Sequence, residues 1–136
     1  MISDNNKLIS IVIPVYGCDS TLSNLVTRVN DVFNKLSYQY EIIFVDDISN
    51  CSTWDVITAL CNNNERVKGV KLSRNFGQHY AITCGLKFAT GEWVVVMDCD
   101  LQDQPEEIIK LIEKTNEGYD IVLAKRALRQ DNFVKN

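Results

Sequence analysis

Short apolar runs recur along the chain, separated by longer segments of mixed character. The runs are nearly continuous and do not alternate with polar residues, which is typical of strands covered on both faces of a parallel sheet. Five segments carry such a run: residues 8–15, 40–45, 67–72, 92–97 and 119–124. The pattern therefore predicts five strands that are largely buried.

The segments between these runs show helical periodicity. The first carries one apolar stripe at helical spacing, formed by Leu22, Leu25, Val26, Val29, Phe33 and Leu36. The second repeats the spacing more briefly at Ile57, Leu60 and Cys61. Ser52 or Thr53 is the predicted N-cap of this second helix, because a hydroxyl can accept a free backbone N–H there.

A third helix is predicted over residues 77–89. Gly85 lowers its helix propensity by up to ~1 kcal/mol relative to alanine, which suggests that the helix approaches the sheet closely at this point. The predicted sheet-facing side consists of Ala81, Gly85, Phe88 and Ala89.

The fourth predicted helix has the clearest ends. Pro105 suits a first helical position, Glu106 and Lys110 are spaced for an ion pair, and Gly118 suits the stop. The resulting order, β-α-β-α-β-α-β-α-β, predicts an α/β fold with a mostly parallel sheet, right-handed crossovers and helices on both faces.

Polar residues follow each predicted strand. Ligands of open parallel sheets bind at the carboxyl ends of the strands, so these positions form a candidate site. They include Tyr16 and Cys18, Asp46 and Asp47, Ser73, Arg74 and Asn75, Asp98 and Asp100, and Arg126.

Composition narrows the function classes. The chain has 136 residues, 46% hydrophobic, with a net charge of -4, which suits one globular domain and argues against non-specific binding to nucleic acid or anionic membrane. We find no signal peptide and no apolar run long enough for a membrane helix. The five cysteines show no CxxC spacing and are interpreted as reduced thiols of a cytoplasmic protein.

The segment Asp98-Cys99-Asp100 is a candidate metal site. In an extended segment, side chains two residues apart point the same way, so Gln102 can add a third oxygen to the two carboxylates. Mg²⁺ and Mn²⁺ prefer such ligands, often together with substrate phosphates. The alternative is a solvated turn before a helix, with Asp103 as a capping group.

Two further loops carry candidate binding groups. Asp46 or Asp47 can accept a hydrogen bond from a base or a ribose, although the same residues also suit a turn. Arg74, just before a predicted helix start, can face a phosphate. His79 has no nucleophile motif near it, so a Ser–His or Cys–His system is poorly supported. The sequence contains neither GxGxxG nor GxxxxGK[ST].

Taken in order, these segments resemble a known family. "ISIVIPVYG", "YEIIFVDDISN", "LSRNFGQ", "GEWVVVMDCDLQDQPEEI" and "EGYDIVLAKR" are similar to motifs of family-2 inverting nucleotide-sugar glycosyltransferases of the GT-A fold. Within that family the chain looks closest to the polyprenyl-phosphate sugar transferases. The resemblance implies a Rossmann-like sheet and a role in cell-wall or polysaccharide synthesis. It covers about residues 8–129.

The resemblance also implies roles for individual residues. Binding of the nucleotide sugar is expected at Pro14, Val15, Tyr16, Asp46, Asp47, Arg74, Asp98, Cys99, Asp100 and Arg126, with Arg129 as a further phosphate contact. Asp47 is the expected partner of the base. Asp98, Asp100 and Gln102 would hold Mg²⁺ or Mn²⁺. The expected donor is a UDP- or GDP-sugar, and the expected acceptor is a lipid phosphate or a glycan.

The sequence departs from the family pattern at Ile48, where glycine is usual, and in "DQPE" at 103–106, where "DPPE" is usual. Family members also continue well past residue 136. Residues 1–136 are therefore expected to be the nucleotide-sugar-binding N-terminal part of a GT-A domain, cut short at its C-terminus. We assign no catalytic base. Localisation is expected to be cytoplasmic, with the inner face of the membrane as an alternative.

Two other hypotheses stay open at this point. The chain can be a catalytically incomplete donor-binding module that assembles with itself, because an incomplete sheet exposes an edge and apolar surface. It can also be a nucleotidyltransferase, although "PVYGCDSTL" lacks the expected Gly/Arg-rich loop.

Overall fold

The centre of the protein is a sheet of four parallel strands in the order β3-β2-β1-β4. The computed structural model describes residues 6–49 and 51–125. The strands are β1 (Leu8–Val15), β2 (Gln39–Asp46), β3 (Val67–Lys71) and β4 (Trp93–Val96). The two central strands, β1 and β2, are buried except at their first residues. The continuous apolar runs are thus explained by layers that cover both faces.

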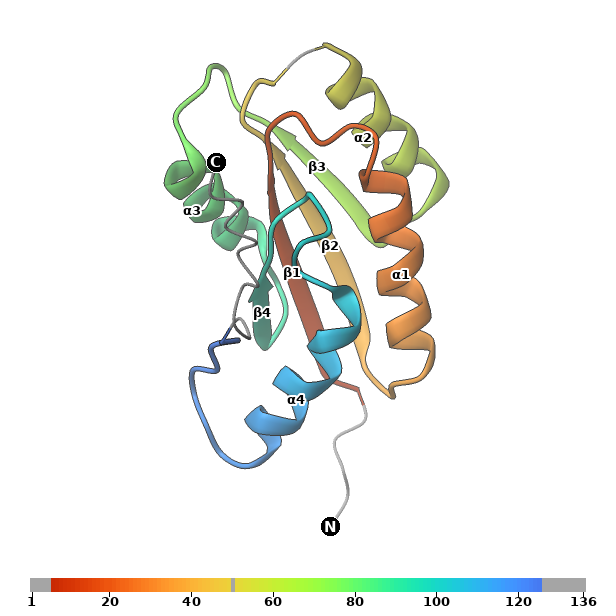
Figure 1. Ribbon diagram of the computed structural model, residues 1–136, viewed down its shortest axis with the longest axis vertical. Coiled ribbons are helices and arrows are strands. Elements are labelled where there is room, and N and C mark those ends of the chain that lie inside the picture. Colours follow the sequence, from red (N-terminus) through yellow and green to blue (C-terminus); the bar gives the residue numbers. More distant parts are fainter. Residues whose placement is uncertain (1–5, 50, 126–136) are drawn as a thin grey trace, which may run out of the picture.

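Helices cover both faces of the sheet, α1 and α2 on one side and α3 on the other (Figure 1). The helices are α1 (Leu22–Asn34), α2 (Cys51–Asn63), α3 (Gln78–Phe88) and α4 (Ile108–Asn116), preceded by the 3-10 turn η1 (Pro105–Glu107). Ile108 and Ile112 of α4 pack into the same core cluster as Leu25 of α1. The predicted class, α/β with a parallel sheet and helices on both faces, is confirmed.

The strands divide their side chains between two apolar clusters. Ile11 and Ile13 of β1 belong to the large cluster beneath α1, α2 and α4, whereas Val12 packs with Val45 and Ala81 beneath α3. Gly85 lets α3 approach the sheet, because a Cβ built there would lie 2.4 Å from Cγ1 of Val12. The close approach predicted at Gly85 is therefore confirmed, although Phe88 of the same predicted face is 53% exposed.

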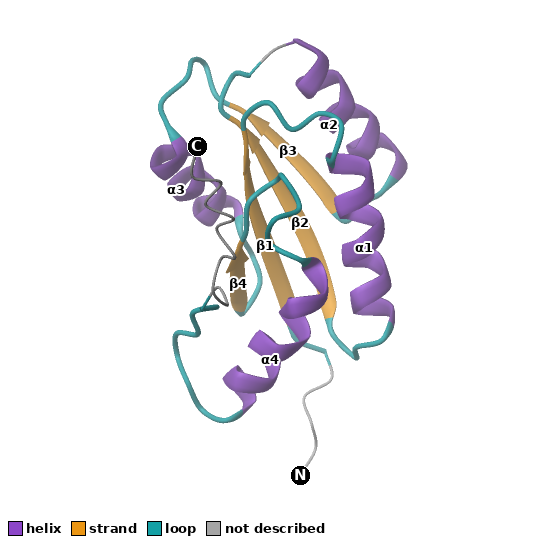
Figure 2. Cartoon of the chain, viewed as in Figure 1, coloured by secondary structure: helices purple, strands orange, loops and turns teal. Residues whose placement is uncertain are grey.

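Residues 119–124 do not form the predicted fifth strand. Figure 2 draws this segment as a loop, and Ile121 and Leu123 are 79% and 86% exposed. This segment makes no strand pairing, although β4 is the last strand of the described sheet and its outer edge is unpaired there. Val94 and Val96 of β4 are exposed as well. An apolar run alone was insufficient to predict a strand here.

Two helix-end predictions can be compared with the structure. Ser52 and Thr53 lie inside the first turn of α2, so neither is the residue before the helix. Gly118, with φ of +98°, follows the end of α4 as predicted, since glycine adopts this conformation without strain. Within the described residues, no helix combines the length and apolar character of a membrane span.

The predicted Glu106–Lys110 pair is also wrong. Glu106 accepts two hydrogen bonds from the guanidinium of Arg28, and Lys110 pairs with Glu107. The bidentate contact with Arg28 lowers the pKa of the Glu106 carboxyl to about 2. The pair joins α1 to η1, because guanidinium and carboxylate match in geometry, and so fixes the chain that follows Asp100.

Candidate functional site

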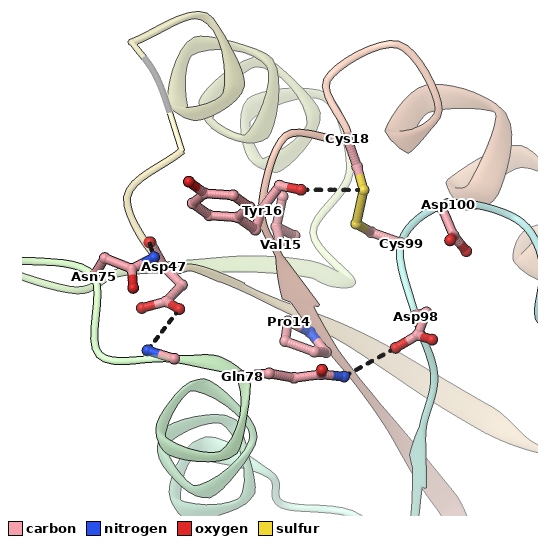
Figure 3. A pocket seen from close by; sticks show the side chains of 11 residues that line it. Pro14, Val15, Tyr16, Cys18, Asp47, Asn75, Gln78, Asp98, Cys99 and Asp100 are labelled. Carbon is pink, nitrogen blue, oxygen red and sulfur yellow. Dashed lines mark hydrogen bonds between the residues drawn. A yellow bond between two sulfur atoms is a disulfide. The ribbon is translucent and has the colours of Figure 1, made fainter.

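A pocket of about 470 Å³ lies at the carboxyl ends of the strands (Figure 3). Its lining residues are Pro14, Val15, Tyr16, Cys18, Asp47, Asn75, Gly77, Gln78, Asp98, Cys99 and Asp100. They belong to the ends of β1, β2 and β4, the loop after β3, and the first turn of α3. Acidic groups from separate strand ends therefore meet at one pocket, as expected for residues that follow parallel strands.

Alternation along β2 explains why Asp47 lines this pocket and Asp46 does not. Phe44 belongs to the cluster beneath α1, and Asp46, two residues further on, shares its side of the sheet. Val45 and Asp47 share the α3 side. The Asp46 side chain is 1% exposed and its Oδ1 accepts the Ser49 hydroxyl at 3.2 Å. Its Oδ2 is buried with no hydrogen-bond partner among the described residues.

Asp47 holds the loop that leads into α3. Its carboxylate oxygens accept the backbone N–H groups of Phe76 and Gly77 at 2.8 and 2.9 Å. Its backbone carbonyl accepts the side-chain amide of Asn75 at 2.9 Å. Because an ionised carboxylate makes strong hydrogen bonds with N–H groups, Asp47 positions this pocket wall. A variant at Asp47 would disturb the loop as well as any ligand contact.

The loop after β3 meets the pocket through residues other than the one predicted. Arg74 is outside the lining, and its guanidinium lies 4.6 Å from the centre of the Phe76 ring. The lining is formed instead by Asn75, Gly77 and Gln78. Gly77 is the N-cap of α3, with φ of +98°, a value that favours glycine. A glycine directly before a helical pattern was the signal that could have identified this turn.

The turn after β4 carries the other two carboxylates. Asp98 Oδ1 accepts the side-chain amide of Gln78 at 3.1 Å, and Asp98 N–H donates to Asp103 at 2.9 Å. Asp100 Oδ1 accepts the backbone N–H of Gln102 at 3.1 Å. Gln102 itself is exposed and outside the lining. The structure thus places Asp98 and Asp100 at the pocket and the predicted third ligand away from it.

These two carboxylates suit a hard divalent cation. The described residues contain no group of three or more His, Cys, Asp or Glu side chains arranged for a metal ion. Mg²⁺ and Mn²⁺ are often bound by one or two carboxylates, with phosphate oxygens and water completing the coordination. The donor set at Asp98 and Asp100 therefore fits a cation that binds together with a diphosphate.

The interpretation of all five cysteines as reduced thiols is wrong for one pair. Cys18 and Cys99 form a disulfide between positions separated by 81 residues in sequence. β1 and β4 are neighbours in the sheet, so the segments after them meet. Cys61 and Cys84 are free.

The remaining predicted residues lie as follows. Pro14 is buried at the pocket, Tyr16 stands at its rim with 66% of its surface exposed, and Val15 packs into the core below it. Arg126 and Arg129 lie outside the described residues.

Comparison with known proteins identifies the family. The family model for glycosyl transferase family 2 matches residues 10–136. The undecaprenyl-phosphate 4-deoxy-4-formamido-L-arabinose transferase of Aeromonas hydrophila is 42% identical over 130 residues, which cover 95% of this chain. The enzyme of that name from Yersinia enterocolitica is 41% identical over 134 residues, 98% of this chain. The matched segments make up 40% and 41% of these two relatives.

Solved structures show the same fold. The mannosyltransferase PcManGT from Pyrobaculum calidifontis, in complex with GDP-Man and Mn²⁺, has a TM-score of 0.61 at 19% identity. It covers 76% of this chain and is itself covered over 30% of its length. Staphylococcus aureus TarS 1–349 with UDP-GlcNAc has a TM-score of 0.59 at 22% identity, with coverages of 82% and 31%. The GT-A fold expected from the resemblance is confirmed, and the chain belongs to glycosyl transferase family 2.

Proposed function

We propose that this chain binds a nucleotide-diphosphate sugar and provides the donor-binding part, residues 1–136, of a sugar transferase. One observation carries the proposal: Asp47, Asp98 and Asp100 line one pocket at the carboxyl ends of the strands. In parallel α/β sheets this edge is where ligands bind. The pocket also combines an aromatic side chain at its rim with carboxylates, which suits a ligand with a base at one end and phosphates at the other.

The nucleoside would bind beside Pro14, Tyr16 and Asp47. The exposed ring of Tyr16 offers a flat apolar surface to a base, and the Asp47 carboxylate offers acceptors to N–H or hydroxyl groups. Asp47 already accepts two backbone N–H groups, yet each carboxylate oxygen can accept more than one hydrogen bond. Because these hydrogen bonds hold the Asp47 carboxylate in one position, we expect it to select among bases by where their N–H groups lie. The relatives in complex with GDP-Man and UDP-GlcNAc support a guanine or uracil nucleotide.

The diphosphate would lie near Asp98 and Asp100. Three carboxylates at one pocket repel an anionic ligand unless a cation is present, so we assign Mg²⁺ or Mn²⁺ to Asp98 and Asp100. When bound, the cation neutralises the diphosphate and stabilises it as a leaving group. The N-terminal end of α3, which begins at Gln78, also favours a bound anion, although the N–H of Gly77 already donates to Asp47.

The reaction would be transfer with inversion at the sugar carbon. An acceptor oxygen forms a new bond to that carbon while the bond to the diphosphate breaks, and the nucleoside diphosphate leaves with the electron pair. We propose a lipid phosphate as the acceptor, supported by the undecaprenyl-phosphate transferases that this chain resembles. A phosphate oxygen is already ionised and needs less help from a base than a hydroxyl. Such an acceptor would place the reaction at the cytoplasmic face of a membrane.

Titration calorimetry on the folded chain tests the proposal. UDP-, GDP- and ADP-sugars are titrated with Mn²⁺, with Mg²⁺ and with EDTA. We expect one nucleotide to bind with metal and to bind at least about tenfold more weakly with EDTA, since the carboxylate charges are then uncompensated. Absence of nucleotide binding in every metal condition, from a chain with a cooperative melt, would refute the proposal.

The exposed apolar surface of β4 favours a second candidate, a donor-binding module that assembles with further copies. Val94 and Val96 are 37% and 46% exposed, and β4 is the last strand of the described sheet. Exposed apolar strands at a sheet edge promote association. Light scattering beside a transfer assay separates the two candidates. A monomer that transfers sugar would refute the module hypothesis, whereas a stable oligomer that binds nucleotide without transfer would support it.

A further inference from the structure

The Cys18–Cys99 disulfide crosses the wall of the pocket. It joins the loop after β1 to the central residue of the Asp98-Cys99-Asp100 segment, with the two Cα atoms 6.0 Å apart. Both cysteines line the pocket (Figure 3). The free cysteines among the described residues, Cys61 and Cys84, do not. The bond is thus placed where it can affect the candidate site.

The two sulfur positions differ in accessibility. Cys99 is 6% exposed and packs within the large apolar cluster, because it points to the opposite side of the sheet from Asp98. Cys18 is only partly buried. A thiolate that enters the pocket therefore reaches the Cys18 sulfur first. An accessible disulfide is the kind that exchanges with thiols, whereas a fully enclosed one resists exchange.

We propose that Cys18 and Cys99 are a reversible thiol–disulfide site that controls how firmly the two walls of the pocket are joined. Its reactants are dithiols, small or protein-borne, and the corresponding disulfides. A thiolate attacks the Cys18 sulfur, the bond to Cys99 breaks, and Cys99 leaves as a thiolate that takes up a proton. A second thiol then attacks the mixed disulfide and releases Cys18. The protein gains two thiols and the reductant becomes a disulfide.

Reduction removes the covalent link between these segments. A hydrogen bond from the Thr21 hydroxyl to the Cys99 carbonyl, 2.6 Å long, still joins them. The closed loop spans 81 residues, so its loss releases considerable chain entropy in the unfolded state. We expect reduction to lower Tm by roughly 10 °C in a domain of this size. Such bonds persist in oxidising compartments and are transient in reducing ones, so the site would respond to its surroundings.

The effect on ligand binding rests on the function proposed above. The oxidised chain holds Tyr16 and Asp98 on joined segments, whereas the reduced chain must order both segments when a nucleotide binds. We expect reduction to weaken nucleotide binding roughly three- to tenfold, because ordering of flexible groups opposes association. Coupling between two equilibria is reciprocal, so a bound nucleotide must favour the disulfide by the same factor.

The test uses the full chain, equilibrated in buffers of reduced and oxidised dithiothreitol at several ratios. Free thiols are alkylated in denaturant and located by peptide mass spectrometry, and the same samples are melted. We expect Cys18 and Cys99 to change together and reversibly, with Tm following the oxidised fraction. Cys18→Ser should melt like the reduced protein and be insensitive to dithiothreitol. Cys61→Ser, the matched control outside the pocket, should retain the full shift.

Several outcomes would overturn the proposal. One is complete alkylation of both cysteines after oxidation of a folded chain. Another is a dithiothreitol-dependent Tm shift that survives in Cys18→Ser. If Cys18→Ser does not fold by circular dichroism, Cys99→Ala provides the same comparison. A final arm measures reduction with and without UDP and GDP in Mn²⁺. Protection of the bond supports the coupling, whereas nucleotide binding with unchanged reduction refutes it. A reversible bond without any nucleotide binding refutes the proposed function and leaves the thiol site standing.

Discussion

Replacement of Gly85 by alanine tests how closely α3 packs on the sheet. Two effects of opposite sign compete. Alanine is the better helix former by about 1 kcal/mol, so propensity alone predicts a more stable protein. The new Cβ, however, would lie 2.4 Å from Cγ1 of Val12 and 3.1 Å from Cγ2 of Val45. Ordinary carbon contacts are about 3.5–4.0 Å, so the first of these is too short by more than about 1 Å.

The neighbours of Gly85 have little freedom to move. Val12 and Val45 are fully buried in the two central strands, and β-branched side chains have few alternative rotamers. Overpacking of this kind costs about 1–3 kcal/mol. After the gain in propensity is subtracted, we expect Gly85→Ala to destabilise the fold by up to about 2 kcal/mol. This corresponds to a decrease in Tm of up to roughly 8 °C.

Thermal and urea unfolding of four variants measures this balance: Gly85→Ala, Val12→Ala, the double variant and Thr83→Ala. Thr83 is exposed on the same helix, and its hydroxyl donates a solvent-exposed hydrogen bond to the His79 carbonyl. Thr83→Ala should be neutral or slightly stabilising, because loss of this exposed bond is offset by the gain in propensity. Val12→Ala combined with Gly85→Ala should be more stable than the sum of the single effects, since the smaller side chain makes room for the new Cβ. A higher Tm for Gly85→Ala, or strict additivity in the double variant, would show that α3 does not press on Val12.

Three further variants probe strain, buried charge and the candidate metal site. Ile48 has φ of +52°, which is unfavourable for a β-branched residue, so Ile48→Asn should raise Tm by a few degrees while Ile48→Val should not. Burial raises the pKa of the Glu41 carboxyl, but hydrogen bonds from Lys68, Ser10 and Thr90 outweigh it and lower the pKa to about 2. The lowered pKa stabilises the fold by about 3 kcal/mol above pH 4.5, and this is lost as the pH falls towards 2. In urea melts, Glu41→Gln should therefore be less stable at pH 7, and its free energy of unfolding should change less between pH 4.5 and pH 2. A variant whose free energy of unfolding falls with pH as steeply as that of the original protein would contradict this. Asp100→Asn should weaken Mn²⁺ binding by about tenfold or more in calorimetry and leave the metal-free Tm unchanged; an unaltered titration would remove Asp100 from the site.

The elements that local pattern determines were predictable from the sequence. The first four strands and all four helices follow from apolar runs and helical stripes, because burial on two faces or on one stripe leaves a signature in consecutive residues. Residues 119–124 carry the same signature and form no strand. Pairing is a property of two segments, so a run of apolar residues does not reveal whether the segment pairs with a sheet edge.

The location of the candidate site could be predicted from the sequence, but only some of the residues that line it could. The alternation of elements predicted a parallel sheet whose strand ends share one edge. The order β3-β2-β1-β4 brings the loops after β1, β2 and β4 together at that edge. Arg74 was chosen for its charge, whereas Asn75 and Gln78 occupy the pocket. Hydrogen bonds from the loop backbone to Asp47 orient that turn. Such contacts join residues that are distant in sequence, so they are invisible until the fold is known.

The disulfide shows how much strand order adds. Five cysteines in a sequence allow many pairings, and their spacing does not choose among them. Cys18 follows β1 and Cys99 follows β4, however, and these strands are neighbours in the order β3-β2-β1-β4. Once that order is assigned, Cys18 and Cys99 belong to segments that meet at the edge of the sheet, which their spacing in sequence does not show. The sheet topology therefore carried information about the cysteines that their own spacing lacked.

Alternation also separates the chemistry of neighbouring residues after β4. The register of β1 and β4 sets Val12 beside Val96, so Asp98 continues the α3 side of the sheet and Cys99 the other side. One side thus supplies a carboxylate to the pocket, and the other supplies the sulfur that ties the wall to the loop after β1. A slip of one residue in this register would exchange the two roles. The site therefore depends on the pairing of β4 with β1 as much as on the acidic residues themselves.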